Sequence, residues 1–385
     1  MTRHWTINGR FLTRPLTGVQ RYGREILHAL DRLLDSSHPL ARDLDLELVV
    51  PDVGPLELPT LKTIRIRKWG RAQGHLWEQA ILPFAVRGGL ISLCSTGPVS
   101  VRKQVVCVHD LNTRLVPGSF SWRFRALYRV LIPTLGRTAE TISTVSHYSA
   151  EQLQRFGVAM PAKTIVIGNG HEHALAWRPA HSAKTRAVAG RNTIAVFGTG
   201  SPNKNVGLLL AMAPALARAN LRLAIAGATN LRVFSSSSHA VTFENVVCLG
   251  RLSDGEISAL LRDSLCLAFP SLVEGFGLPP LEAMTIGCPV VVSNSSCLPE
   301  ICGDAALYAS PTQSEEWLQR FVALRENPSM RAQLIERGLR RSKLYSWQAS
   351  AQLYLDVMAR SDGFLVTDSQ RAMQIPSSAH SPSAV

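Results

Sequence analysis

Short apolar runs alternate with longer amphipathic stretches along the whole chain. Runs of four or five Val, Ile, Leu and Ala residues between turn residues are typical of buried strands, and apolar residues three or four positions apart are typical of helices. Because the two patterns alternate, we expect an α/β fold with parallel sheets. The pattern predicts strands near residues 46–50, 104–108, 141–145, 164–167, 193–197, 222–226, 246–249, 265–269 and 290–293, and helices near 19–34, 74–86, 122–135, 148–156, 206–217, 254–263, 280–286 and 314–324.

The length of 385 residues exceeds what one ordinary core holds, so the sequence predicts two doubly wound, Rossmann-like domains facing a cleft. The stretch 171–191 is polar and irregular, and it is the best linker. The predicted limits are 1–172 for the first domain, 173–190 for the linker, 191–345 for the second domain, 346–360 for a last helix and 361–385 for a disordered tail rich in Ser, Pro and Ala. Ligands of such sheets bind at the carboxyl ends of the strands.

The composition narrows the class of protein. The apolar share is 46%, and no run of eighteen apolar residues that could span a membrane occurs. The first residues lack the apolar core of a secretory signal, so we expect a cytoplasmic protein. Seven cysteines are scattered without a Cys-x-x-Cys pair, which favours free buried thiols over a disulfide or zinc framework.

A formal net charge of +13 needs an explanation, and the candidates are nucleic acid, an anionic membrane and an anionic substrate. Residues 119–136 form a basic amphipathic helix that carries Trp122, Phe124 and Tyr128. Such a helix can lie on the inner face of an anionic membrane, and it can equally pack its apolar face into the core. Nucleic acid is the rival partner, but the sequence contains no recognition helix, zinc spacing or aromatic RNA motif, so we expect no nucleic-acid binding.

The most informative segment runs from Glu274 to Glu282, with the sequence Glu-Gly-Phe-Gly-Leu-Pro-Pro-Leu-Glu. It follows a buried strand and leads into a helix that begins with two prolines. A helix N-terminus binds phosphate, and Gly275 and Gly277 let the backbone approach it. The two carboxylates can accept hydrogen bonds from sugar hydroxyls if both face one pocket with Glu282 in the first turn. Alternatively, both only complement the helix dipole.

The segment resembles a known family over some forty residues. Phe-Pro-Ser-x-x-Glu-Gly-Phe-Gly-Leu-Pro-Pro-Leu-Glu-Ala-Met is followed by Gly-x-Pro-Val-Val-x-Ser-Asn and Leu-Pro-Glu-Ile-Cys-Gly-Asp-Ala-Ala-Leu-Tyr. This series is similar to the retaining, nucleotide-sugar-dependent glycosyltransferases of family 4, which have the GT-B fold. The resemblance implies that Gly275, Phe276, Gly277, Leu278 and Glu282 bind the donor. It also implies that Glu274 positions the donor sugar without acting as a nucleophile, and that the last helix crosses back to the first domain.

A glycine loop between a strand and a helix, residues 198–207, has the layout of a phosphate cradle. Gly198 allows close approach, and Lys204 can neutralise a diphosphate. Lys204 and Asn205 match the family loop. Asn203 and Thr199 stand where many members have arginine, so the diphosphate has one cation fewer than in many relatives.

Other elements of the first half complete the expected cleft. Gly18 opens a helix beside Arg21, in a segment that resembles the family's Gly-Val-x-Arg-Tyr. His109 and Asp110 end a buried strand, where the family has a histidine that reaches the donor sugar and where Asp110 can orient the imidazole or meet the acceptor. A histidine satisfied by the backbone is the alternative. We also expect Ser146, His147, Asn169 and Gly170 near the cleft, and Arg251 in the nucleobase pocket.

Two patterns suggest a metal, and we set both aside. His171-Glu-His173 lacks further ligands, and Asp43-Leu-Asp45 leads into a strand away from the phosphate elements. We therefore expect no cofactor and no required metal. The partners implied by the resemblance are a nucleotide-diphosphate sugar, with GDP-mannose favoured, and a glycan acceptor, plausibly lipid-linked, in bacterial surface polysaccharide synthesis. A sucrose- or trehalose-type synthase with a soluble product is the second enzyme that the pattern allows.

Overall fold

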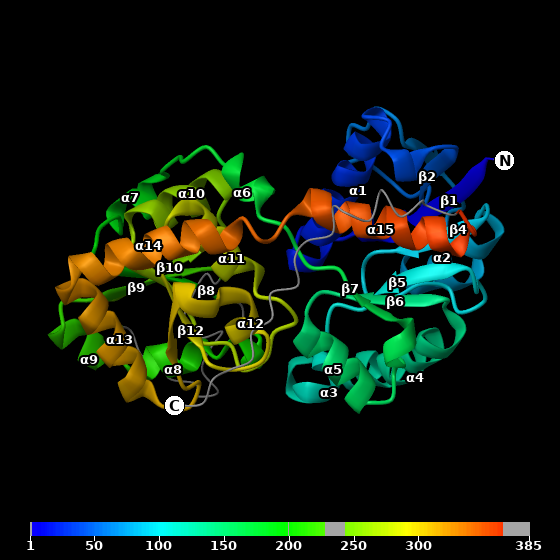
Figure 1. Ribbon diagram of the computed structural model, residues 1–385. Coiled ribbons are helices and arrows are strands. Elements are labelled where there is room, and N and C mark those ends of the chain that lie inside the picture. The colour runs from blue at the N-terminus through cyan, green and yellow to red at the C-terminus, as the bar shows by residue number, and fades with distance from the viewer. Residues whose placement is uncertain (1, 199, 228–242, 365–385) are drawn as a thin grey trace.

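The computed structural model describes residues 2–198, 200–227 and 243–364, which form two lobes joined along one side (Figure 1). Each lobe is built on its own parallel sheet with helices packed against it, which confirms the predicted α/β class. The inner strands of both sheets are buried because helices cover both faces, and the first sheet buries polar side chains such as Thr6, Gln104 and Ser143 beside apolar ones.

The first sheet has seven strands in the order β3-β2-β1-β4-β5-β6-β7. Its strands are β1 (Arg3–Asn8), β2 (Leu44–Val50), β3 (Arg65–Lys68), β4 (Gly89–Ser92), β5 (Gln104–Cys107), β6 (Thr141–Thr144) and β7 (Thr164–Val166), and its helices are α1 (Gly18–Asp35), α2 (Gly74–Ala80), α3 (Asn112–Leu115), α4 (Trp122–Thr138) and α5 (His147–Arg155). Trp5 of β1 lies beside Leu46 of β2 on one side and Gly89 of β4 on the other.

The second sheet has six strands in the order β10-β9-β8-β11-β12-β13. The strands are β8 (Thr193–Phe197), β9 (Arg222–Ala226), β10 (Val246–Gly250), β11 (Cys266–Phe269), β12 (Val290–Ser293) and β13 (Ala306–Ala309), and the remaining helices are α6 (Glu172–Leu175), α7 (Ala183–Ala187), α8 (Val206–Ala211), α9 (Ala213–Arg218), α10 (Asp254–Asp263), α11 (Leu278–Ile286), α12 (Leu298–Cys302), α13 (Ser314–Glu326), α14 (Pro328–Ser342) and α15 (Trp347–Ser361).

Some elements differ from the sequence prediction. The pattern missed β1, β3, β4, β13, α3, α12 and α14, and the helix predicted near 206–217 is divided into α8 and α9. The predicted helix 74–86 ends at Ala80, and Pro83 lies in a separate 3-10 turn. The stretch expected to be an irregular linker carries α6, which packs on α11, and α7, which packs on α10. The limits of the two domains remain predictions.

Helix α15 crosses from the second lobe to the first and lies along α1 (Figure 1). Trp347 at its start and Tyr354 in its middle are fully buried. The Tyr354 hydroxyl lies 3.0 Å from the hydroxyl of Tyr22 on α1. The last helix therefore ties the two lobes together, as the resemblance implies.

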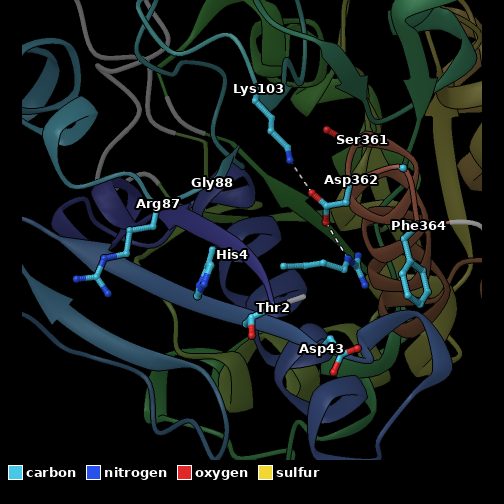
Figure 2. Close-up of a pocket in the computed structure, with 11 residues that line it drawn as sticks. Thr2, His4, Asp43, Arg87, Gly88, Lys103, Ser361, Asp362 and Phe364 are labelled. Carbon is cyan, nitrogen blue, oxygen red and sulfur yellow. Dashed lines mark hydrogen bonds and ion pairs between the residues drawn. The ribbon is translucent and has the colours of Figure 1, made fainter.

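The end of α15 is fixed by Asp362 (Figure 2). Its carboxylate accepts hydrogen bonds from Arg3 Nε at 2.8 Å, Trp5 Nε1 at 2.9 Å and Lys103 Nζ at 2.6 Å. The prediction that placed residues 361–385 in a disordered tail is thus wrong for residues 361–364, because Asp362 is an ordered ion-pair partner. Residues 365–385 lie outside the described part of the chain.

Candidate active site

Helix α11 follows the loop after β11, and no side chain caps its N-terminus. Gly277 precedes it with φ 90° and makes no side-chain cap, and Gly287 ends it with φ 81°. Among the described residues, the backbone N–H groups of Gly275, Phe276, Gly277 and Leu278 have no hydrogen-bond acceptor. Four unpaired N–H groups at a helix start form a site for an anion.

Lys204 and the two acids Glu274 and Asp110 meet beside this helix start. Lys204 Nζ lies 2.7 Å from Glu274 Oε1. Burial raises the pKa of the Asp110 carboxyl; the N–H of Asn112 opposes the rise and the charge of Glu274 adds to it. The structure therefore brings together three residues from three separate segments, as the sequence predicted.

Glu282 is the fifth residue of α11 and lies in its second turn. The prediction that put it in the first turn is wrong, because the helix begins at Leu278. Its Oε1 lies 2.8 Å from His173 Nε2. His173 Nδ1 accepts a hydrogen bond from Trp347 Nε1 at 2.9 Å. Because the indole N–H can only donate, Nδ1 carries no proton, so Nε2 carries it and donates to Glu282. The Glu282 carboxylate is thus held by a hydrogen bond from a neutral His173.

Arg21 links the two lobes at the same carboxylate. Its Nη2 lies 2.6 Å from Asp254 Oδ1, its Nε lies 3.7 Å from Glu282 Oε1, and its guanidinium lies over the ring of Trp177. Burial alone lowers the pKa of Arg21, but the charges of Glu282 and Asp254 outweigh burial and raise it. The start of α1 thus faces α10 and α11 across the cleft.

The loop before α1 is open at this point. Gly18, the first residue of α1, has nothing within 4 Å of where a Cβ would stand, and Thr17 provides no side-chain cap. Arg251 Nη2 lies 3.5 Å from the carbonyl oxygen of Leu16, so the residue expected in the nucleobase pocket lies against this loop. The second helix N-terminus at the cleft is therefore also accessible.

His109 follows β5 at the carboxyl edge of the first sheet. Its Nε2 lies 2.8 Å from the Leu93 carbonyl oxygen, which can only accept, so Nε2 carries a proton and Nδ1 is the nitrogen left for a ligand. The predicted alternative, a histidine bonded to backbone, therefore applies to one ring nitrogen. A Cβ at Gly275 would lie 2.4 Å from the His109 carbonyl oxygen, so this glycine allows the lobes to touch.

The expected neighbours of the cleft hold the lobes in contact. Ser146 Oγ donates to the Gly275 carbonyl at 2.6 Å. The backbone N–H of His147 donates to Glu300 Oε1 at 2.8 Å. A Cβ at Gly170 would lie 2.1 Å from the Trp347 nitrogen. These residues fix the geometry of the cleft from both sides.

Three residues predicted to bind the donor also serve the protein's own packing. Asn205 Nδ2 donates to the carbonyls of Pro270 and Pro311. Phe276 is buried edge-on against Tyr345. The Gly198 N–H donates to the Ala226 carbonyl. A ligand can meet the backbone of these residues more readily than their side chains. Thr199 lies outside the described residues.

The metal-like patterns are separated in space. His171 Nδ1 bonds the Tyr345 carbonyl, Glu172 accepts from the Trp347 N–H, and His173 bonds Glu282. Asp45 pairs with Arg65. In the part of the chain that the structure describes, no group of three His, Cys, Asp or Glu side chains could hold a metal ion.

Comparison with known proteins identifies the class of fold. Residues 178–341 match the sequence model of the family described as Glycosyl transferases group 1. The chain has the GT-B fold, and its second half is similar to this family of glycosyltransferases. Its α/β lobes align with sucrose-phosphate synthase from Thermosynechococcus elongatus at a TM-score of 0.66 and 16% identity, over 94% of this chain and 100% of that one.

The relatives point further, to mannosyltransferases. The chain is 24% identical to the O-antigen chain mannosyltransferase RfbU of Salmonella typhimurium over 333 residues, which cover 84% of this chain and 91% of the relative. It is 39% identical to the O-antigen chain mannosyltransferase B of Escherichia coli, over 100 residues that span 26% of each chain. Thus only about a quarter of this second relative is matched.

The sequence did not identify His173 as a site residue. It noticed the residue only as half of a metal-like pair. The signal that could have found it is the His-Glu-His segment directly after Gly170, since α6 begins there and carries His173 against α11.

Proposed function

We propose that this protein is a retaining glycosyltransferase of family 4 that moves a hexose, mannose from GDP-mannose in the favoured case, from a nucleotide-diphosphate sugar to a glycan acceptor. The observation that carries the proposal is the row of unpaired N–H groups from Gly275 to Leu278, flanked by Lys204 and two carboxylates. This arrangement offers cationic and N–H partners to a diphosphate and acceptor oxygens to hydroxyls.

The donor would bind across the loop before α11. Its diphosphate takes the N–H groups and Lys204, Glu282 accepts from a ribose hydroxyl, and Glu274 accepts from the sugar. His109 Nδ1 hydrogen-bonds a further sugar hydroxyl. The open start of α1 at Gly18 lies across the cleft, so it can add N–H groups to the phosphates. No metal is required in this scheme, because the helix ends and Lys204 stabilise the leaving diphosphate.

The transfer would proceed on one face of the sugar. The bond between the anomeric carbon and the diphosphate oxygen breaks, and the acceptor hydroxyl oxygen bonds to the same face of that carbon. The acceptor's proton passes to the departing diphosphate oxygen. Asp110, with its raised pKa, lies where it can orient the acceptor.

The acceptor proposed is a lipid-linked glycan of a bacterial surface polysaccharide, used at the cytoplasmic face of the membrane. The names of the two O-antigen mannosyltransferases support this choice. The fold shared with sucrose-phosphate synthase keeps a soluble sugar as the second candidate acceptor.

A calorimetric titration of the protein with GDP-, UDP- and ADP-sugars tests the donor. We expect one of them to bind, and Glu282→Ala to weaken that binding while Glu274→Ala chiefly lowers turnover. Glu326→Ala, an exposed glutamate at the end of α13, is the matched control. If no nucleotide sugar binds, or if both site variants retain normal activity, the proposal is wrong. Transfer to a lipid-linked acceptor against a free sugar then separates the two candidate acceptors.

A further inference from the structure

Helix α4 has an apolar stripe on its outer side as well as one on its inner side. The inner stripe, which includes Leu131, Ile132 and Leu135, is buried in the first lobe. Trp122, Ala126 and Val130 follow at four-residue intervals, so they share another stripe along the helix. Trp122 is 67% exposed and Val130 is 68% exposed. An ordinary surface helix has polar residues there.

Arginines border this outer stripe. Arg125 lies three positions after Trp122, Arg129 three positions after Ala126, and Arg123 directly after Trp122, where its guanidinium stands over the indole. In the described part of the chain, none of these three arginines has a carboxylate within ion-pair distance. From Leu111 to Ala139 the sequence contains no acidic residue at all.

Arginines on other helices of the chain do form ion pairs. Arg340 pairs with Glu336 on α14, and Arg360 pairs with Asp356 on α15. Next to α4, burial lowers the pKa of Arg114, and the charge of Arg129 lowers it further. The positive charge around α4 is therefore available to an external anionic surface.

The position of α4 connects this face to the cleft. The 3-10 turn η4 (Pro117–Ser119) leads into α4 and packs against the 3-10 turn η6 (Pro202–Lys204), which carries the lysine of the site. In Figure 1, α4 lies at the outer edge of the first lobe, away from the crossing helix α15. A flat partner on α4 would leave the cleft accessible beside it.

We propose that the outer face of α4, formed by Trp122, Arg123, Arg125, Ala126, Arg129 and Val130, docks on an anionic phospholipid bilayer. Trp122 and Val130 enter the boundary between head groups and acyl chains, and the arginines contact the lipid phosphates. The docking deepens the proposed function, since it would bring the cleft to a lipid-linked acceptor. In the described residues no helix is long and apolar enough to cross a bilayer.

Flotation with vesicles of phosphatidylglycerol and phosphatidylcholine, and with vesicles of phosphatidylcholine alone, tests the docking on the full-length protein. We expect binding to the mixed vesicles only. Because each basic residue at a membrane surface contributes about 1 kcal/mol, R123A/R125A/R129A should bind roughly 100-fold more weakly. Val130→Glu should also abolish binding, by placing a charge in the apolar stripe.

Matched controls come from α14 in the other lobe and from the two residues that follow it, Lys343 and Leu344. R337A/R340A/K343A removes the same formal charge, and Leu344→Glu places a carboxylate on a residue that is 61% exposed. Both should bind vesicles as the unaltered protein does. The proposal is overturned if the unaltered protein ignores phosphatidylglycerol, or if the α14 variants lose as much binding as the α4 variants.

Two further readouts separate this proposal from its rivals. If Val130→Glu turns a dimer into a monomer in sedimentation while vesicles never bind, the face joins two copies of the chain and the docking is wrong. Duplex DNA that binds more tightly than the vesicles to the same arginines also overturns it. Nucleotide-sugar titration should give the same Kd for all α4 variants, so a failure of the donor proposal and a failure of docking are distinguishable.

Discussion

At the scale of single residues, the charged side chains of the candidate site form ion pairs with one another, and a ligand must break or share these contacts. Lys204 is paired with Glu274, and Glu282 is held by His173 and approached by Arg21. Each pair lies between elements that are far apart in the sequence. A phosphate that binds Lys204 must therefore compete with Glu274, and a hydroxyl that donates to Glu282 must share this carboxylate with His173 and Arg21.

Lys204→Ala should raise the donor Kd by about 10-fold or more, because a charged hydrogen bond to phosphate contributes roughly 1.5–3 kcal/mol. Calorimetric titration with the donor measures the change. Lys343→Ala, at the exposed end of α14, serves as the control and should leave the Kd unchanged. An unaltered Kd for Lys204→Ala would remove this lysine from the phosphate site.

His173→Phe should weaken the binding of the nucleotide sugar, although residue 173 makes no contact with that ligand in the proposed arrangement. The phenyl ring still packs near Trp177 and Trp347. However, Glu282 loses the N–H that donates a hydrogen bond to it, and the indole N–H of Trp347 loses its acceptor. Each loss costs about 1–3 kcal/mol. We expect a higher donor Kd by calorimetry together with a lower free energy of unfolding.

The matched control for this histidine is His181→Phe, which breaks a hydrogen bond of 2.8 Å to Asp263 outside the cleft. It should lower stability and leave the donor Kd as it was. If His181→Phe and His173→Phe change the Kd equally, the effect is one of folding and His173 does not position Glu282.

At the scale of elements, the loop before α11 brings the lobes into contact. Gly275→Ala would place a Cβ 2.4 Å from the His109 carbonyl oxygen, a backbone atom that cannot move aside alone. We expect the turnover number to fall at least about 10-fold, since a misplacement of about 1 Å can cost 100-fold. Steady-state kinetics with the nucleotide sugar that binds in the calorimetric titration measures it.

Gly118→Ala in η4 is the control for this glycine, because nothing lies within 4 Å of its Cβ position. It should retain full turnover. Normal activity in Gly275→Ala would mean that the lobes have room at this contact and that the loop does not set the geometry of the site.

The sequence predicted the elements around α11 well, because each boundary has a local cause. Pro279 and Pro280 start the helix, Gly287 ends it in the left-handed conformation, and apolar β11 and β12 flank it. The edge strand β3 was missed because its pattern is Arg-Ile-Arg-Lys. Its two arginines pair with Asp45 and Glu47 of β2, contacts between residues twenty positions apart that periodicity does not detect.

The candidate site was predictable where one segment carries it and not where distant segments meet. Glu274, Glu282 and Lys204 follow from motifs. The bond from His173 to Glu282 depends on α6 packing under α11, and the tautomer of His173 depends on Trp347, which is 174 positions away. Such tertiary contacts leave no local pattern. The roles of these residues in binding remain predictions until a donor is titrated.

At the scale of the whole molecule, α15 is the part that makes two lobes one protein. Its start is capped by Ser346, whose side chain accepts from the Ala349 N–H, and Glu172 accepts from the Trp347 N–H. Its end is fixed on the first lobe by Asp362. Because the helix is anchored at both ends, a substitution at its last turn should lower the stability of the first lobe and change the relative position of the lobes.

Asp362→Ala should therefore destabilise the protein by about 3 kcal/mol, since it leaves Arg3 buried without its partner. Asp356→Ala removes an exposed pair with Arg360 on the same helix and should cost at most about 0.5 kcal/mol. Urea denaturation measures both. A chain that ends at Arg360 also lacks Asp362 and should be as unstable as Asp362→Ala; equal stability of these variants and the unaltered protein would show that the ion pairs do not anchor the helix.

The same residue predicts a pH dependence. Burial alone raises the pKa of Asp362, but hydrogen bonds from Lys103, Arg3 and Trp5 outweigh burial and lower it. A carboxyl whose pKa is lower in the folded state stabilises the fold above its ordinary pKa of about 3.9, and this contribution disappears as the pH falls through the folded value. The stability difference between the unaltered protein and Asp362→Ala should thus be constant near neutral pH and shrink below about pH 4. A difference that grows on acidification would contradict an ionised Asp362 in the folded protein.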